Sequence, residues 1–350
     1  MEKTAVFGHF GFGRELLNGQ TVKAKIITAE LERSLGKENV VKLDTGGGIK
    51  ALLRLPLQVF WTSRRCRNLI MLPAHNGVRI LTPLLRLRAM FTGASLYYIL
   101  IGGWLPAFLQ KRRGLARQLK KFDAIYAETR TAKQALEAMG FDNVAVMPNC
   151  KELPITESAP LADRPAPPYR LCIFSRVMKE KGVEDAVCIV QALNEKAGRP
   201  LYCLDIYGPV DEAQVEWFEE LKQTFSEAVR YEGCVPFAQS TQILKSYFAL
   251  LFPTRFYTEG VPGTIIDAYA AGVPVISARW ESFADVVEEG VTGFGYTLGN
   301  TEELTELLQR IADDPTQIWN LKGNCIQRAG DFTPAAVMAD LTARLKSERA

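Results

Sequence analysis

The stretch FYTEGVPGTIIDAYAAGVPVIS, residues 256–277, places an acidic residue, a loop, a helix and a strand in immediate succession. A helix is predicted from about Gly263 to a stop at Gly272, and a strand follows over Val273–Ser277. A helix that begins directly after a glycine-bearing loop presents free backbone N–H groups, which suit a phosphate or a dense set of hydroxyls. The loop residues before this helix are Gly260, Val261, Pro262 and Gly263.

Two carboxylates flank the loop and the helix start. Glu259 precedes the loop, and Asp267 lies eight positions later, three residues after Thr264 and on the same helix face. Both acids can therefore flank one polar ligand, because carboxylates bind neutral hydroxyls through charge-assisted hydrogen bonds. Taken alone, each acid has an ordinary explanation. Asp267, near the start of a helix, complements the helix dipole, and Glu259 belongs to a simple Glu-Gly turn.

The complete string resembles the Glu-x7-Glu signature of the retaining glycosyltransferases of family 4, also called group 1, which have the GT-B fold. In that family the first acid binds hydroxyls of the donor sugar. The second acid binds the nucleotide ribose, and the loop amides bind the sugar and the diphosphate. The resemblance implies that Glu259 is catalytic and that the loop, Thr264 and Asp267 bind the donor. Asp267 departs from the pattern, since it is one methylene shorter than glutamate.

The length and composition are those of a globular protein with room for two cores. The chain has 350 residues, of which 47% are hydrophobic and 23% are charged. Its seven cysteines are dispersed and it has two histidines, which argues against a zinc site and for a reducing compartment. The N-terminal residues MEKTAVFGHFGFG lack a signal-peptide pattern, so a cytoplasmic location is predicted.

Charge is distributed very unevenly along the chain. Residues 1–150 carry 23 Lys or Arg and 10 Asp or Glu, a net charge of +13, whereas the remainder carries −10. Between Asp44 and Asp123 there is no acidic residue, but there are fourteen Lys or Arg. A solvated helix face usually mixes both signs, so this stretch favours anionic partners: phospholipid head groups, a lipid pyrophosphate or nucleic acid.

The N-terminal residues predict a βαβ unit with a glycine loop in its first turn. The loop GHFGFG, residues 8–13, has the glycine order G-x-x-G-x-G rather than the G-x-G-x-x-G of dinucleotide-binding folds. It is similar to the N-terminal loop of the same glycosyltransferases, which implies donor binding at Gly11 and Gly13. A polar insertion follows the loop, and in it Asn18 and Gln20 are candidates for binding the acceptor or a sugar.

His75 is a third candidate for binding the acceptor. It follows a strand predicted over Asn68–Leu72 and precedes a helix predicted over Ile80–Met90, at a position where ligands collect in α/β folds. The alternative is an ordinary hydrogen-bonding loop histidine.

The window Phe91–Leu109 is apolar but is broken by Gly102, Gly103 and Pro106, so an aromatic-rich strand and loop is predicted rather than a membrane span. Basic residues then alternate with apolar ones over Lys111–Phe122. That pattern is typical of an interfacial helix on an anionic membrane, here the inner face of the plasma membrane. A plain surface helix is the alternative.

A proline-rich segment after Pro148 marks a domain boundary. The predicted domains are residues 1–150 and 151–335, and a C-terminal helix, residues 336–350, packs back on the first domain. The second half again alternates strands with helices, which implies a parallel sheet with ligands at the carboxyl ends of its strands.

Two basic residues follow the first strand of the second half, at Arg176 and Lys181. They are similar to the Arg…Lys pair with which the family holds the donor diphosphate, although basic residues in such a loop are often only solvated. Tyr207, Gly208 and Val235 match places that flank the nucleotide base in such folds. The chain contains no Asp-x-Asp, so no metal and no cofactor are predicted.

The resemblance implies a GT-B fold, with two Rossmann-like parallel-sheet domains facing across a cleft. The basic first domain would bind the acceptor and the second the donor. The implied reaction moves a hexose-type sugar from a nucleotide sugar, with UDP favoured, to a glycan, with retention of configuration. The leaving phosphate would take the acceptor proton, and Arg176, Lys181 and the helix amides would stabilise the leaving diphosphate. A lipid-linked polysaccharide or lipopolysaccharide precursor is the predicted acceptor.

Three other readings compete with this prediction. An NAD-dependent oxidoreductase would use the loop at residues 8–13 with Asp44 as its ribose ligand, but leaves Glu259 and Asp267 unexplained. A nucleotide-sugar epimerase of the same fold is a second alternative. The third is a non-catalytic scaffold that binds membrane or nucleic acid through residues 50–121, for which no nucleic-acid motif is present.

Overall fold

The computed structural model forms two compact units, each built on its own sheet. The structure describes residues 3–11, 19–46, 48–155, 166–236 and 239–347. Unit 1 comprises Met1–Glu152 and Phe332–Ala350, and unit 2 comprises Leu153–Asp331. Residues 151–152 and 332–335, which were assigned to the second domain, therefore belong to unit 1. None of the helices in the described ranges combines the length and apolar character that crossing a bilayer requires.

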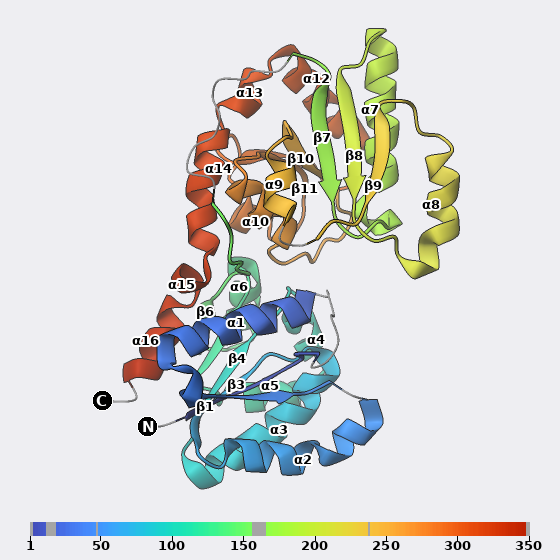
Figure 1. Cartoon of the computed structure of the whole chain (residues 1–350). Helices are drawn as coiled ribbons and strands as arrows, with labels where there is room; N and C mark the ends of the chain where they lie inside the picture. Colours follow the sequence, from blue (N-terminus) through green and yellow to red (C-terminus); the bar gives the residue numbers. More distant parts are fainter. Residues whose placement is uncertain (1–2, 12–18, 47, 156–165, 237–238, 348–350) are drawn as a thin grey trace. The chain divides into compact units, whose positions relative to one another are not determined.

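Unit 1 contains a six-stranded parallel sheet with the strand order β2-β1-β3-β4-β5-β6 (Figure 1). Its strands are β1 (Lys3–Gly8), β2 (Val40–Asp44), β3 (Cys66–Met71), β4 (Ser95–Ile99), β5 (Ala124–Ala127) and β6 (Val144–Val146). Its helices are α1 (Gly19–Leu35), η1 (Lys37–Asn39), α2 (Gly48–Ser63), α3 (His75–Thr92), α4 (Leu105–Gln110), α5 (Arg113–Leu119), α6 (Arg130–Ala138), α15 (Pro334–Val337) and α16 (Ala339–Ser347).

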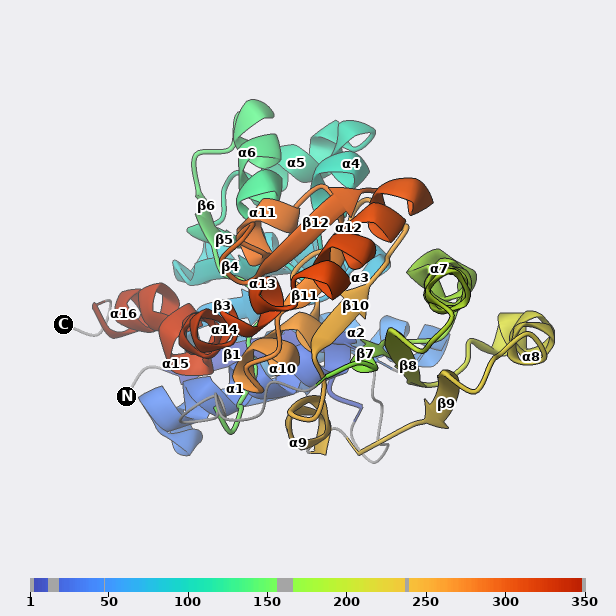
Figure 2. The same cartoon turned by 90° about the horizontal axis from the view of Figure 1, so that it is seen from above.

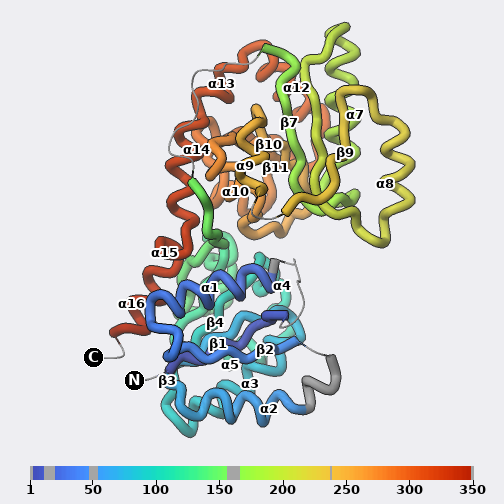
Figure 3. The backbone as a smooth tube through the Cα atoms, in the orientation of Figure 1, coloured from blue at the N-terminus to red at the C-terminus, as the bar shows by residue number. Residues whose placement is uncertain are grey.

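Alternate residues of these strands enter two hydrophobic cores, one on each face of the sheet. In β3, Ile70 packs in the core of α1, whereas Leu69 and Met71 pack in the core of α2 and α3. Strands covered on both faces read as continuous apolar runs, which is why they were predictable. The C-terminal helices α15 and α16 contact α1 (Figure 3), and Tyr126 of β5 donates a 2.9 Å hydrogen bond to Asp340.

Unit 2 contains the second six-stranded parallel sheet, ordered β12-β11-β10-β7-β8-β9. Its strands are β7 (Tyr169–Phe174), β8 (Tyr202–Tyr207), β9 (Val229–Gly233), β10 (Ala249–Phe252), β11 (Val275–Arg279) and β12 (Gly293–Thr297). Its helices are η2 (Lys179–Lys181), α7 (Val183–Ala197), η3 (Glu212–Gln214), α8 (Val215–Lys222), α9 (Ser240–Leu244), α10 (Gly263–Ala270), α11 (Phe283–Val286), α12 (Thr301–Asp313), α13 (Thr316–Trp319) and α14 (Lys322–Ala329), with η5 (Gly330–Phe332) at the boundary between the units.

The two faces of the second sheet carry different helices. Figure 2 shows α7 and α12 on one side of the strands and α9 and α10 on the other. Strands β7 and β10 are neighbours in the middle of the sheet and run parallel, with Leu171 opposite Ala249. Because parallel neighbours end at the same edge, the loop after β7 lies beside the loop after β10.

The helices of unit 1 include one that was not predicted and another in a segment for which two alternatives were left open. Helix α2 was not predicted, because Pro56 within it interrupts the helical pattern. For the basic segment Lys111–Phe122, an interfacial helix and a plain surface helix were the two alternatives, and the structure has only the short helix α5 there, with Ala116 and Leu119 buried. Leu119 and Phe122 are buried in the core of α2 and α3, so these apolar residues are not available to a membrane.

Two further corrections concern the residues around His75 and Trp104. Helix α3 begins at His75, five residues earlier than predicted, so this histidine opens a helix rather than lying in a loop. The predicted strand and loop after β4 contain a helix, α4, which begins directly after Trp104. Pro106 is compatible with this helix, because the first turn needs no N–H from that position.

Candidate functional site

The carboxylate of Glu259 lies just past the carboxyl end of β10. Thr254, a buried residue two positions after that strand, donates a 3.1 Å hydrogen bond from its hydroxyl to Glu259 Oε1. The same hydroxyl accepts a 3.2 Å hydrogen bond from the Phe256 N–H, which bends the chain around it. The side chain of Glu259 is 17% exposed. It is therefore held in one orientation while remaining accessible.

Lys181 reaches Glu259 from the loop after β7. Its ammonium forms an ion pair with Glu259 Oε1 and is also 17% exposed. The aromatic rings of Phe252 and Phe256 lie 5.4 and 5.0 Å from the ammonium, close enough for cation–π attraction. Lys181 and Glu259 are 78 residues apart in sequence. The parallel pairing of β7 with β10 is what brings them together.

Gly182 lets the two loops approach so closely. Its φ is +68°, and a Cβ on it would lie 1.9 Å from the carbonyl oxygen of Pro253. Such a distance is impossible for a real side chain, so only glycine allows the loop after β7 to rest on the end of β10. The close approach fixes where Lys181 stands relative to Glu259.

A second tie between these loops involves Arg255, which was not predicted as a site residue. Its backbone N–H donates to the Glu180 carbonyl at 2.8 Å. Its guanidinium binds both carboxylate oxygens of Asp185, on α7, at 2.6 and 3.0 Å. The hydrogen bond to Asp185 raises the pKa of Arg255 above its usual value. In the sequence, Arg255 could have been noticed because it lies next to the predicted motif. That position does not reveal which residue it binds.

Arg176 does not join Lys181 at Glu259. Its guanidinium is 57% exposed and lies 3.5 Å from Asp211 Oδ2, within the loop that follows β8. The structure thus brings Lys181, but not Arg176, into contact with Glu259. An exposed arginine with a single long ion pair is free to reorient, because a surface pair of this kind contributes little free energy.

Helix α10 starts where it was predicted, at Gly263. Its N-cap is Pro262, which has no side-chain group to bind the first backbone N–H groups. The Thr264 hydroxyl oxygen is buried and has no hydrogen-bond partner among the described residues. Asp267 is buried one turn further along the helix, and Val261 of the preceding loop is buried as well. The first turn of α10 therefore offers backbone N–H groups and a hydroxyl to an anion.

Tyr207 and Gly208 have structural partners that the predicted base-binding role did not include. The Tyr207 ring is buried and stacks on Phe174 at 4.9 Å, and its hydroxyl shares a 2.8 Å hydrogen bond with Tyr247. Burial raises the pKa of both tyrosines, so they stay neutral. A Cβ on Gly208 would lie 1.9 Å from the Ser175 carbonyl oxygen. Val235 is half-buried after β9.

The candidates in unit 1 are spread over several segments. Gly11 follows β1 with φ +61°, and Gln20 lies in the first turn of α1. Gly13 and Asn18 lie outside the described residues. His75 is exposed and stacks on Trp104, with ring centres 4.1 Å apart.

The carboxyl edge of the first sheet also holds a buried ion pair that was not predicted. Lys23 of α1 lies 3.2 Å from Glu128, which follows β5, and their side chains are only 2% and 5% exposed. Lys23 also donates to the Leu100 carbonyl at 3.1 Å, and Glu128 accepts the Gly102 N–H at 2.5 Å. The pair therefore fastens the segment after β4, which leads to Trp104.

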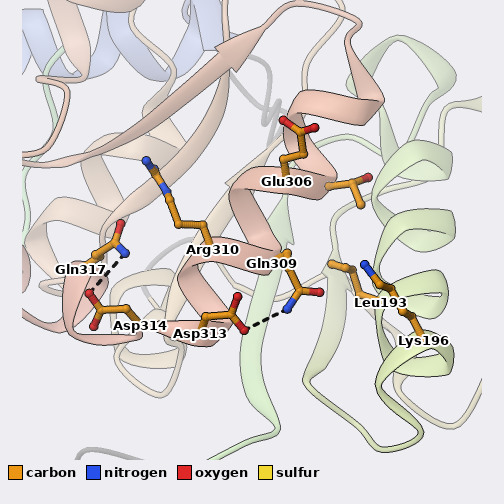
Figure 4. A pocket seen from close by; sticks show the side chains of 9 residues that line it. Leu193, Lys196, Glu306, Gln309, Arg310, Asp313, Asp314 and Gln317 are labelled. Atoms are coloured by element: carbon orange, nitrogen blue, oxygen red, sulfur yellow. Dashed lines mark hydrogen bonds between the residues drawn. The ribbon is translucent and has the colours of Figure 1, made fainter.

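A surface hollow between α7 and α12 lies apart from these residues (Figure 4). Several of its polar side chains bind one another, as Gln309 does Asp313 at 3.1 Å and Gln317 does Asp314 at 3.3 Å. The hollow contains none of the predicted site residues and is not the candidate site. Within the described part of the chain, no three His, Cys, Asp or Glu side chains gather as metal ligands would.

Residues 168–314 match the family model described as "Glycosyl transferases group 1". Among curated proteins, the chain is similar to the amylovoran biosynthesis glycosyltransferase AmsK of Erwinia amylovora, with 24% identity over 155 residues. That alignment covers 43% of this chain and 38% of AmsK, so the chain matches well under half of its curated relative.

Two solved structures resemble the whole chain. HepE of Anabaena, in complex with UDP, has a TM-score of 0.74 at 16% identity and covers 99% of this chain and 100% of its own. The apo lipopolysaccharide outer core galactosyltransferase WaaB has a TM-score of 0.70 at 17% identity and covers 99% of each chain. HepE was also solved with UDP-glucose. The likeness shows that the fold is GT-B, with two units each carrying a six-stranded parallel sheet.

Proposed function

We propose that the protein, whose residues 168–314 match the family model of the group 1 glycosyl transferases, is a retaining glycosyltransferase that acts without a metal. It transfers a hexose-type sugar from a nucleotide sugar to a glycan. UDP is the favoured nucleotide, which is supported by the UDP and UDP-glucose complexes of HepE. The contact of Lys181 with Glu259, next to the first turn of α10, is the observation that carries the proposal.

In the proposed reaction, the bond between the sugar C1 and the diphosphate oxygen breaks, and a bond from C1 to the acceptor oxygen forms on the same face. The acceptor hydroxyl gives its proton to the leaving phosphate, so no protein base is needed. Lys181, with Arg176 swinging in from the surface, stabilises the negative charge that develops on the diphosphate. The first N–H groups of α10 add a positive end to the same site.

Glu259 positions the sugar in this scheme. Its carboxylate is oriented by Thr254 and Lys181, which leaves its second oxygen to accept hydrogen bonds from sugar hydroxyls. Asp267 contributes to ribose binding from the buried face of α10. Gly260 and Gly263 let the diphosphate approach the backbone closely.

The acceptor belongs to unit 1 in this proposal and is a lipid-linked polysaccharide or lipopolysaccharide precursor. This assignment is supported by the surplus of positive charge in residues 1–150, which suits a lipid pyrophosphate. The polysaccharide and lipopolysaccharide roles in the names of AmsK and WaaB agree with it. The enzyme would then work in the cytoplasm at the inner face of the plasma membrane.

A thermal-shift panel with UDP, GDP, ADP, TDP and NAD, without added metal, tests the donor site. A nucleotide at ~100 times its dissociation constant stabilises the native state by about 2.7 kcal/mol. We expect UDP to raise the melting temperature of the wild type, and Lys181→Met and Arg176→Ala to weaken that shift. Lys222→Met, which removes a surface ion pair with Glu219, is the matched control and should respond as the wild type does. A shift with NAD alone would contradict the proposal.

A further inference from the structure

Helices α2 and α3 expose large apolar side chains that have no place in the core. Of the ten large hydrophobic residues that stand exposed in the described ranges, six lie on these two helices. Trp61 is 55% exposed, Met90 73% and Phe91 81%. We call this set the α2–α3 face; its members are Leu57, Phe60, Trp61, Leu87, Met90 and Phe91.

The spacing of these residues shows that they form a second apolar surface and are not core residues that are partly exposed. Leu57 and Trp61 are one turn apart on α2, and Leu87 and Phe91 are one turn apart on α3. Other residues of the same helices, Leu55 and Val59 on α2 and Leu81 and Leu85 on α3, are buried in the core. Each helix is thus apolar on two sides, which indicates a partner for the outer one.

The two helices present this surface as one unit. They pack against each other, and Arg88 of α3 binds both the hydroxyl and the carbonyl of Ser63 at the end of α2, each at 3.2 Å. The Arg88 guanidinium also lies 5.8 Å from the centre of the Phe60 ring. These contacts hold the exposed aromatic rings of α2 beside the exposed residues of α3.

Every charged residue of the segment that carries the α2–α3 face is positive. Residues 45–122 contain no Asp or Glu, and Arg54, Arg64 and Arg65 are exposed on or just after α2. The Arg64 guanidinium lies 4.9 Å from the centre of the Trp61 ring. A second copy of this chain would bring the same positive charge against it and be repelled. Aromatic and apolar side chains beside arginines instead match the interface of an anionic bilayer.

We propose that the α2–α3 face binds the surface of an anionic lipid bilayer. Phe91, Met90 and Trp61 insert at the level of the head groups, while Arg64 and Arg65 bind lipid phosphates. This relocates the contact from the segment Lys111–Phe122, whose apolar residues are used by the core. The inference deepens the proposed function, on which it rests for a lipid-linked acceptor.

Cosedimentation of the full chain with phosphatidylcholine vesicles, with and without phosphatidylglycerol, tests the proposal. We expect binding to the anionic vesicles that weakens with salt, and little binding to neutral ones. Trp61→Ala together with Phe91→Ala should weaken binding by roughly tenfold or more, since two large side chains no longer insert. Arg64→Gln should weaken it by about fivefold, the effect of one cation near the surface.

Matched controls lie on unit 2: Val215→Ala removes an exposed apolar side chain and Arg199→Gln an exposed arginine. Both should bind vesicles as the wild type does. The proposal is overturned if the controls lose as much vesicle binding as the α2–α3 variants, if the α2–α3 variants bind vesicles unchanged, or if the wild type binds neutral and anionic vesicles equally. It is also overturned if the protein forms a dimer without lipid and Trp61→Ala converts that dimer to a monomer. The UDP thermal shift, measured on the same samples, separates failure of the donor site from failure of this surface.

Discussion

Each unit places a Lys–Glu pair at the carboxyl edge of its sheet, and the two pairs differ in what surrounds them. Lys23 and Glu128 of unit 1 are almost fully buried, and each has a backbone partner besides the other. Lys181 and Glu259 of unit 2 are partly exposed and lie beside the first turn of a helix. The first pair is sealed and holds the fold, whereas the second can exchange its partner for a ligand.

The sealed pair predicts the largest loss of stability. Lys23→Met leaves Glu128 buried without its counter-ion, and breaking such a pair costs about 3–5 kcal/mol. Urea unfolding of the full chain measures the free energy of unfolding. Lys133→Met, which removes the surface partner of Glu137 in the same unit, is the matched control and should change it by about 1 kcal/mol or less. If both variants lose the same free energy of unfolding, burial does not distinguish the Lys23–Glu128 pair from the Lys133–Glu137 pair.

The open pair predicts a loss of activity with little loss of stability. Lys181→Met removes the cation that the proposed function assigns to the leaving diphosphate, and the loss of such a group lowers the rate by roughly 10²–10³-fold. Release of UDP from UDP-glucose is the readout, and urea unfolding of the same variant should change little. Lys222→Met serves as the control. A variant that unfolds more easily but turns over normally would show that this pair, too, is structural.

The close approach at Gly182 predicts an intermediate effect on both quantities. Gly182→Ala adds a Cβ against the Pro253 carbonyl, so we expect a loss of roughly 2–4 kcal/mol and weaker UDP binding. Gly198 has a similar φ, +63°, but open space around its Cβ position. Gly198→Ala therefore isolates the backbone strain, about 1–2 kcal/mol. Equal losses in the two variants would mean that the clash with Pro253 does not matter.

The tie between Arg255 and Asp185 predicts the smallest effect. Arg255→Lys keeps the charge but loses the two-pronged contact, and because the arginine is exposed the cost is about 0.5 kcal/mol. We expect affinity for UDP to fall a few-fold, measured by calorimetry. Arg344→Lys, at a surface pair with Asp340, is the control and should leave UDP binding unchanged. An unaltered affinity in Arg255→Lys would remove this tie from the donor site.

The sheets and the start of α10 were predictable because burial on both faces leaves a direct pattern in sequence. Each strand of the first sheet is a short apolar run, and α10 begins at the predicted Gly263. Helix α2 was not predicted because Pro56 interrupts the helical pattern of a segment that is apolar on two sides. The sequence left an interfacial helix and a plain surface helix open for Lys111–Phe122, because spacing alone does not reveal whether an apolar stripe faces a core or a membrane.

The site could be predicted in its parts but not in its contacts. Glu259 and Lys181 were both named, yet only the pairing of β7 with β10 makes them partners. Arg176 was predicted to hold the diphosphate together with Lys181, but the sequence did not indicate its ion pair with Asp211. The partners of Arg255 and Lys23 depend on residues 70 and 105 positions away, a distance at which local patterns carry no information.

The return of the chain to unit 1 after Asp331 has a consequence for how the protein is made. Unit 2 is one continuous segment, so its core is complete once Asp331 has left the ribosome. Unit 1 is not, because Met338, Leu341 and Leu345 complete the core under α1 and are synthesised after all of unit 2. Unit 1 is therefore begun before unit 2 and finished after it. Until then, the apolar surface of α1 and its sheet lacks the side chains of α16 that cover it.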